Sequence, residues 1–265
     1  MQENRSSSIP GTLTGQTVIV TGAAGEIGAA YAAAFARAGA DVLATDLPTA
    51  REAGEALTEK ITAEGRGHAA FVAGNITEDA DLAEIVRTAR ERFGGVDALV
   101  NNAALYQAIG GKRPLTDLTN ADWDRVLTVN VRGTWQAIKA AVPAMRERDG
   151  GRIVNIASTV ARSGAAGFAH YVASKAAVEG LTRAAAKELG QYGITVNAVA
   201  PGLVEDEASR TLNTGEYLTQ AAGIRSIPRR MLPDDLVGAV LWLCSRSSGF
   251  VSGQTLIVDG GQVFG

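Results

Sequence analysis

Residues 16–28 read QTVIVTGAAGEIG, and this stretch decides the fold. Its first six residues form a β-branched run that leads into a glycine, which predicts a strand over residues 16–21. After the glycines, apolar residues recur at the three- and four-residue spacing of a helix face that packs on a core: Ile27, Ala30, Tyr31, Ala34, Phe35 and Ala38. A strand, a glycine turn and an amphipathic helix in direct succession predict the first unit of an α/β sheet.

The same alternation continues along the chain. Further short apolar runs predict strands over residues 41–45, 68–73, 97–100, 152–157, 194–199 and 255–258. Stretches with helical periodicity lie between them, including a long predicted helix around residues 120–147. Because parallel crossovers are right-handed, this order predicts an α/β fold: a single Rossmann-type, doubly wound parallel sheet of about seven strands, with helices on both faces.

The chain of 265 residues shows no linker, repeat or low-complexity segment inside its body, which favours a single domain over residues 13–265. Residues 1–12 are polar and have no apolar signal-peptide core, so we expect a mobile N-terminal tail there. A polar, acidic stretch over residues 203–230 interrupts the alternation.

Composition argues against several classes of partner. The net charge is -3 and no basic stripe appears, so we expect no nucleic-acid partner. The longest uncharged apolar runs fall short of the roughly 18 residues that a membrane span needs. Cys244 lies on a helix-spaced apolar face, which predicts core packing. It is the single cysteine, so no intramolecular disulfide is possible, and this favours a reducing, cytoplasmic location. Only His68 and His170 are histidines, so we expect no metal site.

Most of the predicted strands end in glycine or in a polar or turn residue. These ends carry Gly22, Asp46, Asn75, Asn101, Asn102, Ser158, Pro201 and Gly202. The carboxyl ends of parallel strands meet at one edge of a sheet, and ligands of doubly wound sheets bind beyond that edge. The convergence of six such ends predicts one ligand site.

Two of these ends point to a dinucleotide. The glycines of the first turn let backbone approach a ligand closely, and a helix N-terminus favours a pyrophosphate. Asp46 stands 24 residues after Gly22, where a carboxylate binds both ribose hydroxyls and repels a 2′-phosphate, which predicts NAD(H) rather than NADP(H). The alternative for the first turn is a tight strand–helix turn without a ligand, and the alternative for Asp46 is a solvated turn aspartate.

A second cluster points to proton transfer. Tyr171 and Lys175 are four residues apart in a predicted helix and therefore share a face. A lysine beside a tyrosine favours the phenolate, because opposite charge stabilises the charged form. This pair alone is a weak signal, but Ser158 at a strand end thirteen residues before the tyrosine strengthens it.

Together these residues resemble the short-chain dehydrogenase/reductase family. The motifs are Thr-Gly-x-x-x-x-x-Gly after the first strand, Asn-Asn-Ala after the fourth, Ser158, Tyr171-x-x-x-Lys175 and Pro201-Gly202. The resemblance covers residues 13–262, and within the family the chain looks most like NAD-dependent secondary-alcohol dehydrogenases and 3-oxoacyl reductase-like members.

The resemblance implies a role for each catalytic candidate. Tyr171 would be the general acid/base, Lys175 would lower the tyrosine pKa and bind the nicotinamide ribose, and Ser158 would hydrogen-bond the substrate oxygen. Asn130 would hold a water that connects Lys175 to solvent. The alternatives are a turn serine, a solvated lysine and, for Asn130, a buried amide that satisfies backbone. The cofactor would be held by Gly22, Gly25, Glu26, Ile27, Gly28, Asp46, Leu47, Asn75, Ile76, Asn102, Ala103, Ala104, Tyr171, Lys175, Pro201, Gly202 and Val204.

The sequence departs from the family pattern at four places. Glu26 replaces the middle glycine of the first turn, and Asn75 replaces an aspartate after the third strand. Ala104 replaces a glycine, and the usual threonine after Pro-Gly is lost within residues 203–206. None of these changes touches the proton-transfer set, so we expect altered cofactor affinity rather than lost chemistry.

The leading hypothesis is an NAD(H)-dependent oxidoreductase that interconverts a small secondary alcohol and its ketone, mostly neutral and partly apolar. The alternatives are a 3-oxoacyl-thioester ketoreductase, against which Asp46 counts, and a non-catalytic NAD-sensing module, which would typically lose Tyr171 or Lys175. The resemblance implies a homo-oligomer, a dimer or homotetramer, built on helices near residues 120–147 and 170–190. The fold that the resemblance implies places a substrate lid after the sixth strand, over residues 203–230. We expect the loop over residues 105–113, with Tyr106, to face this lid across the substrate.

Overall fold

The computed structural model describes residues 13–64 and 67–264, so the mobile tail expected over residues 1–12 lies outside the described part. One sheet of seven parallel strands organises these residues, in the order β3-β2-β1-β4-β5-β6-β7. The strands are β1 (Thr17–Thr21), β2 (Asp41–Asp46), β3 (Ala69–Ala73), β4 (Ala98–Asn101), β5 (Gly151–Ile156), β6 (Ile194–Pro201) and β7 (Thr255–Val258). The prediction of a doubly wound parallel sheet is confirmed, and the strand order reverses between β1 and β4.

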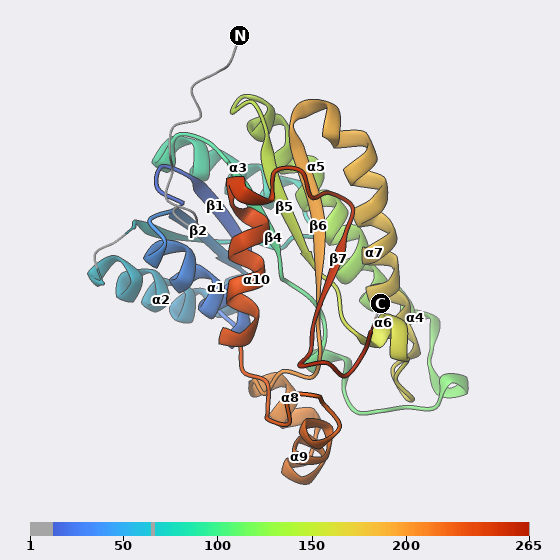
Figure 1. The fold of residues 1–265 in the computed structure, drawn as a ribbon. Coiled ribbons are helices and arrows are strands. Elements are labelled where there is room, and N and C mark those ends of the chain that lie inside the picture. Colours follow the sequence, from blue (N-terminus) through green and yellow to red (C-terminus); the bar gives the residue numbers. More distant parts are fainter. Residues whose placement is uncertain (1–12, 65–66, 265) are drawn as a thin grey trace.

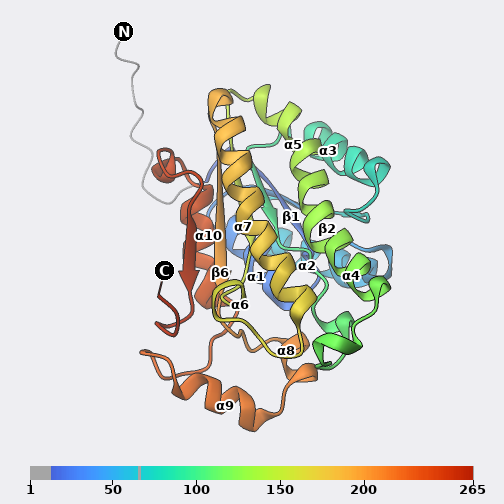
Figure 2. The same cartoon turned by 90° about the vertical axis from the view of Figure 1, so that its right-hand side faces the viewer.

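Helices cover both faces of the sheet (Figures 1 and 2). Their bounds are α1 (Glu26–Arg37), α2 (Arg51–Ala63), α3 (Asp79–Phe93), α4 (Asn120–Leu127), α5 (Thr134–Arg146), α6 (Val160–Ser163), α7 (Ala169–Leu189), α8 (Glu207–Leu212), α9 (Gly215–Gly223) and α10 (Asp234–Cys244). Helices α1, α2 and α10 contribute to the core on one face, and α3, α5 and α7 to the core on the other.

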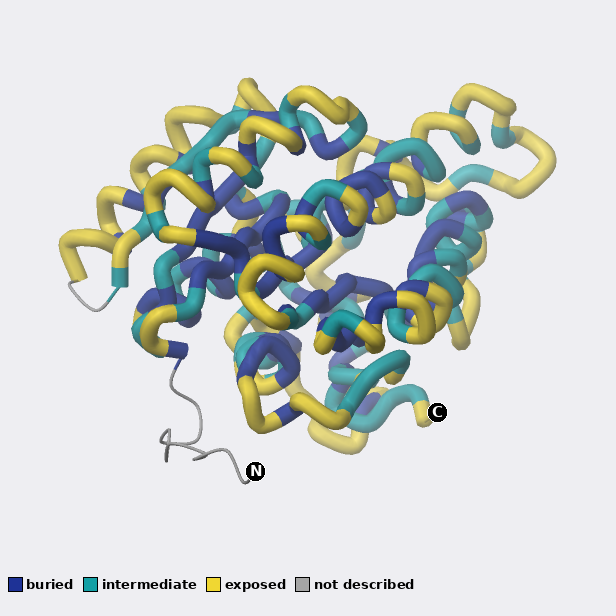
Figure 3. Tube along the Cα trace, turned by 90° about the horizontal axis from the view of Figure 1, so that it is seen from above, coloured by how far each residue is buried: buried dark blue, intermediate teal, exposed yellow. Residues whose placement is uncertain are grey.

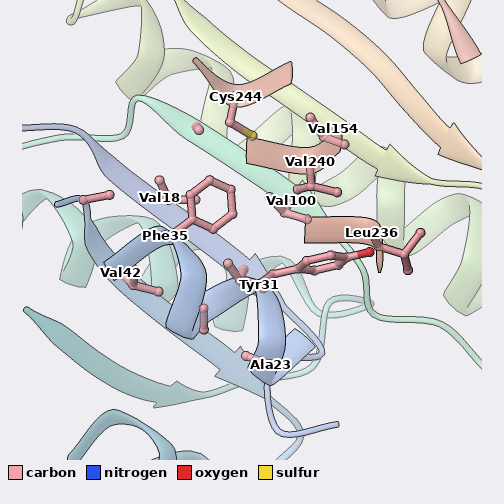
Figure 4. Packing of buried hydrophobic residues seen from close by; sticks show 14 of the residues in the cluster. Val18, Ala23, Tyr31, Phe35, Val42, Val100, Val154, Leu236, Val240 and Cys244 are labelled. Atoms are coloured by element: carbon pink, nitrogen blue, oxygen red, sulfur yellow. The ribbon is translucent and has the colours of Figure 1, made fainter. Parts of the chain in front are cut away.

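The two cores follow from the alternation of side chains along each strand. Val18 and Val20 of β1 belong to one core, whereas Ile19 between them belongs to the other. Figure 4 shows the first core, in which Phe35 of α1 and Cys244 of α10 meet over the strands. The predicted core packing of Cys244 is therefore confirmed, and Figure 3 shows buried backbone in the middle of the molecule with exposed turns around it.

The predicted long helix around residues 120–147 is interrupted in the structure. A π-helical turn (Thr128–Gly133) separates α4 from α5, although both continue in nearly the same register. π-turns inside helices frequently occur at functional sites. The extra residue in this turn places Asn130 in a buried position that faces the loop after β4.

Residues 203–230 contain two short helices, α8 and α9, which lie beyond one end of the sheet (Figures 1 and 2). They follow β6, so they lie at the edge formed by the carboxyl ends of the strands. Arg225 fastens this segment, because its buried guanidinium donates to the carbonyls of Leu203 (2.7 Å) and Arg229 (3.0 Å).

Replacing Phe35 by alanine is expected to lower the free energy of unfolding by about 3–5 kcal/mol, because the ring is fully buried and its removal leaves a cavity. Urea unfolding followed by circular dichroism measures this change. Leu115→Ala is the control, since that side chain is 70% exposed and its loss should change stability by less than about 0.5 kcal/mol. Equal effects of the two substitutions would contradict the core assignment.

Candidate active site

The predicted strand-end residues gather at one edge because all seven strands are parallel. Neighbouring ends are also bonded directly: the Thr159 amide after β5 donates to the carbonyl of Pro201 at the end of β6 (2.9 Å). The side chain of Asn102 after β4 donates to the carbonyls of Thr21 (3.1 Å) and Gly22 (3.0 Å). The edge is thus a connected surface, as the sequence predicted.

The first turn requires its outer glycines. Gly22 has a φ of 64°, and a Cβ there would lie 2.8 Å from Cα of Ala103. A Cβ at Gly28 would lie 2.1 Å from the carbonyl oxygen of Gly22. Helix α1 begins after Gly25 with no side-chain cap, so no side chain occupies its first N–H groups. An uncapped helix N-terminus behind a glycine turn fits a pyrophosphate.

Asp46 lies at the end of β2 with its carboxylate held in place. Its two oxygens accept hydrogen bonds from the backbone amides of Ala24 (3.0 Å) and Leu47 (2.8 Å). Asn75, after β3, uses its side-chain oxygen to cap its own turn by accepting from the amide of Thr77 (3.1 Å). A carboxylate beside the first turn fits the ribose-binding position that the sequence predicted.

The structure shows where two departures from the family pattern point. Glu26 turns outward and forms an ion pair with Arg210 of α8, with both side chains near half exposure. Ala104 is exposed, so its methyl group meets solvent rather than core. Glu26 therefore leaves the backbone of the first turn open, and its charge is paired rather than isolated.

Tyr171 and Lys175 lie side by side near the end of β5, and Ser158 follows that strand two residues after Ile156. The Lys175 ammonium is buried, donates to the carbonyl of Ile156 (2.7 Å) and lies 5.7 Å from the centre of the Tyr171 ring. Only Ala157 lies between the end of β5 and Ser158. The hydroxyl of Ser158 accepts a long hydrogen bond from the amide of Val160 (3.4 Å). The hydroxyl proton of Ser158 is thus not used by that bond.

Burial dominates the titration of this pair. It lowers the pKa of Lys175 from 10.5 to about 8, because the ammonium loses water. Burial raises the pKa of Tyr171, with smaller contributions from Tyr106 and from the charge of Asp206. The ammonium of Lys175 is directed at the carbonyl of Ile156, and the expected lowering of the tyrosine pKa by Lys175 stays a prediction.

Asn130 uses its side chain to fasten the loop after β4. Its oxygen accepts from the amide of Leu105 (2.7 Å), and its amide group donates to the carbonyl of Leu105 (3.2 Å) and the hydroxyl of Ser174 (3.1 Å). This is the backbone-satisfying alternative that the sequence left open. The water link from Asn130 to Lys175 stays a prediction, and the observed contacts assign Asn130 a positioning role.

Tyr106 packs against the catalytic tyrosine candidate. Its ring centre lies 5.2 Å from that of Tyr171 and 6.3 Å from that of Phe168. The pKa of Tyr106 is raised, mainly because the side chain is buried. A hydrogen bond with Asn213 offsets part of this increase, and the charge of Asp206 adds to it. The loop also touches α8, where Gln107 donates to the hydroxyl of Thr211 (3.3 Å). The Tyr171 side chain thus packs beside Tyr106 and the apolar cluster that contains Phe168, and the loop of Tyr106 in turn contacts α8.

The residues after β6 approach the same edge. The Gly202 amide donates to the carbonyl of Val258 (3.0 Å), and a Cβ at Gly202 would lie 2.8 Å from Cβ of Asp259. Val204 is buried and forms a parallel bridge with Met231. This backbone is therefore held rigidly where the sequence predicted contact with the nicotinamide end of a cofactor.

Sequence reasoning missed a buried polar chain behind the site. The Asn101 amide donates to the side-chain oxygen of Asn155 (2.8 Å), whose own amide donates to the hydroxyl of Thr182 (2.9 Å). The signal was available, because Asn155 is a polar residue within a strand that is otherwise apolar apart from Arg152. This series of hydrogen bonds links β4, β5 and α7 directly beneath Ser158 and Lys175.

Over residues 13–64 and 67–264, no three His, Cys, Asp or Glu side chains gather in a way that could hold a metal ion. Within the same residues, no helix combines the length and the apolar character that crossing a membrane requires.

Comparison with known proteins agrees with this site. A family model described as enoyl-(acyl carrier protein) reductase matches residues 22–262. The chain is 37% identical over 257 residues to the A-factor type gamma-butyrolactone 1′-reductase (1S-forming) of Streptomyces virginiae, covering 95% of this chain and 96% of the relative. It is 37% identical over 263 residues to galactitol 2-dehydrogenase of Agrobacterium fabrum (94% and 98%). It is 33% identical over 252 residues to the 3-oxoacyl-[acyl-carrier-protein] reductase of Vibrio cholerae (94% and 98%).

Solved structures show the same fold. A dehydrogenase/reductase from Sinorhizobium meliloti superimposes with a TM-score of 0.88 at 34% identity, over 96% of this chain and 98% of that one. A structure from Beutenbergia cavernae, described as an NAD(P) dependent gluconate 5-dehydrogenase with bound NADP, gives 0.86 at 35% identity with the same coverage.

This chain belongs to the short-chain dehydrogenase/reductase family. It is therefore an oxidoreductase that acts on an alcohol or carbonyl group with a nicotinamide cofactor.

Burial of Lys175 predicts a specific pH dependence of stability in the cofactor-free protein. Below pH 8 both the folded and unfolded chains hold the lysine proton, and folding must bury the charge. Between pH 8 and 10.5 only the unfolded chain keeps the proton, so stability rises with pH relative to a Lys175→Met variant, by about 3 kcal/mol in total.

Urea unfolding of both proteins at several pH values measures the difference, in which the other titrating groups cancel. Lys187→Met is the control, because this exposed lysine lies on the same helix. A difference between wild type and Lys175→Met that stays flat across this pH range would contradict the burial of the charge.

Proposed function

We propose that this chain interconverts a secondary alcohol and its ketone with NAD(H), with Tyr171 as the general acid/base. The observation that carries the proposal is the joint position of Tyr171, Lys175 and Ser158 at the sheet edge that also holds the first glycine turn and Asp46. A proton donor beside a dinucleotide-binding edge is what carbonyl reduction requires, since the nicotinamide supplies the hydride when it is bound.

The residues divide the remaining work. Ser158 has a free hydroxyl proton with which to hold the substrate oxygen, and Tyr171 delivers or removes the proton at that oxygen. Lys175 has a pKa of about 8, so it is largely cationic at neutral pH and favours the phenolate once it turns toward the tyrosine. The rings of Tyr106 and Phe168 keep water away from this proton path.

The preference for NAD(H) rests on Asp46. Two backbone amides hold its carboxylate at the end of β2, so the charge cannot easily turn away from a ribose in that position. A 2′-phosphate would meet that negative charge at close range. The relative from Beutenbergia cavernae binds NADP, and the proposal therefore depends on this carboxylate and not on the family as a whole.

The cofactor residues proposed from the sequence fit this geometry. The pyrophosphate would lie at the N–H groups of the first turn, the adenosine at Asp46 and the loop after β3, and the nicotinamide at the ends of β4 and β6. The set is Gly22, Gly25, Glu26, Ile27, Gly28, Asp46, Leu47, Asn75, Ile76, Asn102, Ala103, Ala104, Tyr171, Lys175, Pro201, Gly202 and Val204.

The α8–α9 segment (residues 203–230) would serve as the substrate lid of a single domain spanning residues 13–265. A 3-oxoacyl-thioester substrate is less favoured, although the Vibrio cholerae relative is a 3-oxoacyl-[acyl-carrier-protein] reductase. Arg229 and Arg230 form ion pairs with Asp235 and Glu205, so they do not present a free basic patch to a carrier phosphate.

The family and the composition support a proposal for the quaternary state and the location. We expect a dimer or homotetramer through the outer helices α4, α5 and α7, where Trp135 remains 47% exposed. A chain whose only cysteine is buried suits the reducing cytoplasm.

Replacing Tyr171 by phenylalanine is expected to reduce turnover of a good alcohol or ketone by at least 1,000-fold, on the order of a lost general acid/base. NADH affinity should change by less than about threefold, because the ring remains in place. Initial rates of NADH absorbance change and a fluorescence titration measure the two effects. Tyr192→Phe, at the far end of α7, is the matched control, and surviving activity in Tyr171→Phe would refute the assignment.

Wild-type protein is expected to bind NADH at least about tenfold more tightly than NADPH, a ratio that needs about 1.4 kcal/mol of discrimination. Asp46→Ala should reduce this ratio, because the repulsion of the 2′-phosphate is removed. Asp41→Ala, at the amino end of the same strand, should leave the ratio unchanged. Equal wild-type affinities in calorimetric titrations would overturn the NAD(H) preference.

A further inference from the structure

Arg210 brings a positive charge from α8 to the first glycine turn. Its guanidinium is paired with the carboxylate of Glu26, although the two residues are 184 positions apart. A second nitrogen of the same group donates to the carbonyl of Glu205 (3.4 Å). This contact joins the segment after β6 to the start of α1.

The ion pair between Glu26 and Arg210 lies next to the proposed cofactor site. Glu26 is the first residue of α1, whose initial N–H groups carry no side-chain cap and form the proposed pyrophosphate position. A carboxylate alone at that point would repel the phosphates, so the neighbouring guanidinium offsets its charge. As an exposed ion pair it would add little to stability, which makes a purely structural role a weak one.

Arg210 also has donors to spare. A guanidinium carries five N–H donors in a planar fork that matches phosphate oxygens. Among the described residues, its side chain donates to Glu26 and to the Glu205 carbonyl. One arginine can therefore hold Glu26 and a phosphate oxygen together.

We propose that Arg210 is a cofactor-binding residue, whose guanidinium bridges Glu26 and the pyrophosphate and so fastens α8 over the first turn. The inference rests on the proposed use of a nicotinamide dinucleotide and adds a binding residue from the opposite side of the site. It also accounts for the unusual Glu26, since the arginine offsets the charge of this carboxylate beside the phosphates.

The test is calorimetric titration of NADH and of ADP-ribose, which carries the pyrophosphate without the nicotinamide. Arg210→Gln is expected to weaken both ligands about tenfold, the scale of a lost charge-assisted hydrogen bond. Arg210→Gln made in a Glu26→Gln background should still weaken both ligands by about fivefold or more. Arg87→Gln, which removes an exposed paired arginine from α3, is the control for net charge and should change neither affinity.

Each other result has a distinct meaning. If Arg210→Gln has no effect in the Glu26→Gln background, the arginine only neutralises Glu26 and the proposal is wrong. If NADH is weakened and ADP-ribose is not, Arg210 acts through the nicotinamide end and the proposed bridge is also wrong. If wild-type protein binds neither ligand, the proposed cofactor itself fails, whereas normal wild-type binding with an unchanged Arg210→Gln variant refutes this inference alone. Matching thermal midpoints show that the variants are folded.

Discussion

The close approach of the first turn to its neighbours is the constraint on which the rest of the site depends. The backbone of Gly28 passes so near the carbonyl of Gly22 that even a methyl group would overlap it, and a Cβ at Gly22 would lie 2.8 Å from Cα of Ala103. This approach places the start of α1 against the end of β4, and the side chain of Asn102 holds the two together. The reversal of strand order at β1 and β4 then leaves an open edge at that point, and the residues proposed to bind the cofactor lie along it.

The proposed proton transfer depends on a second condition, the burial of ionisable groups. Lys175 is buried and Tyr171 is partly buried, and each shift in pKa favours the neutral form. This arrangement costs stability, which the surrounding bonds must offset: Asn130 holds Leu105, and the chain from Asn101 through Asn155 braces the strands beneath. The polar groups beneath the site are thus structural supports that hold the proposed reacting groups in position.

The sequence was a good guide where a pattern repeats and a poor one where a single contact decides. Periodicity predicted the parallel sheet and so brought Asp46 and Ser158 to one edge, because parallel strands leave no other arrangement. It could not predict the π-turn at Asn130, since one extra residue leaves the apolar spacing almost unchanged. The outward turn of Glu26 depends on a partner far along the chain, and local propensity carries no information about such a partner.

The segment after β6 connects the two halves of the site. It reaches the first turn through Arg210 and the loop after β4 through the contact of Thr211 with Gln107, so one short helix touches both the cofactor edge and the wall beside Tyr171. A displacement of α8 would therefore disturb both regions together. Its base is rigid, since buried Arg225 holds the backbone of Leu203, whereas its outer surface is exposed. In the proposed function, substrate selection changes through the exposed residues of α8 and α9, while Tyr171 and Lys175, the proposed proton-transfer residues, remain fixed on α7.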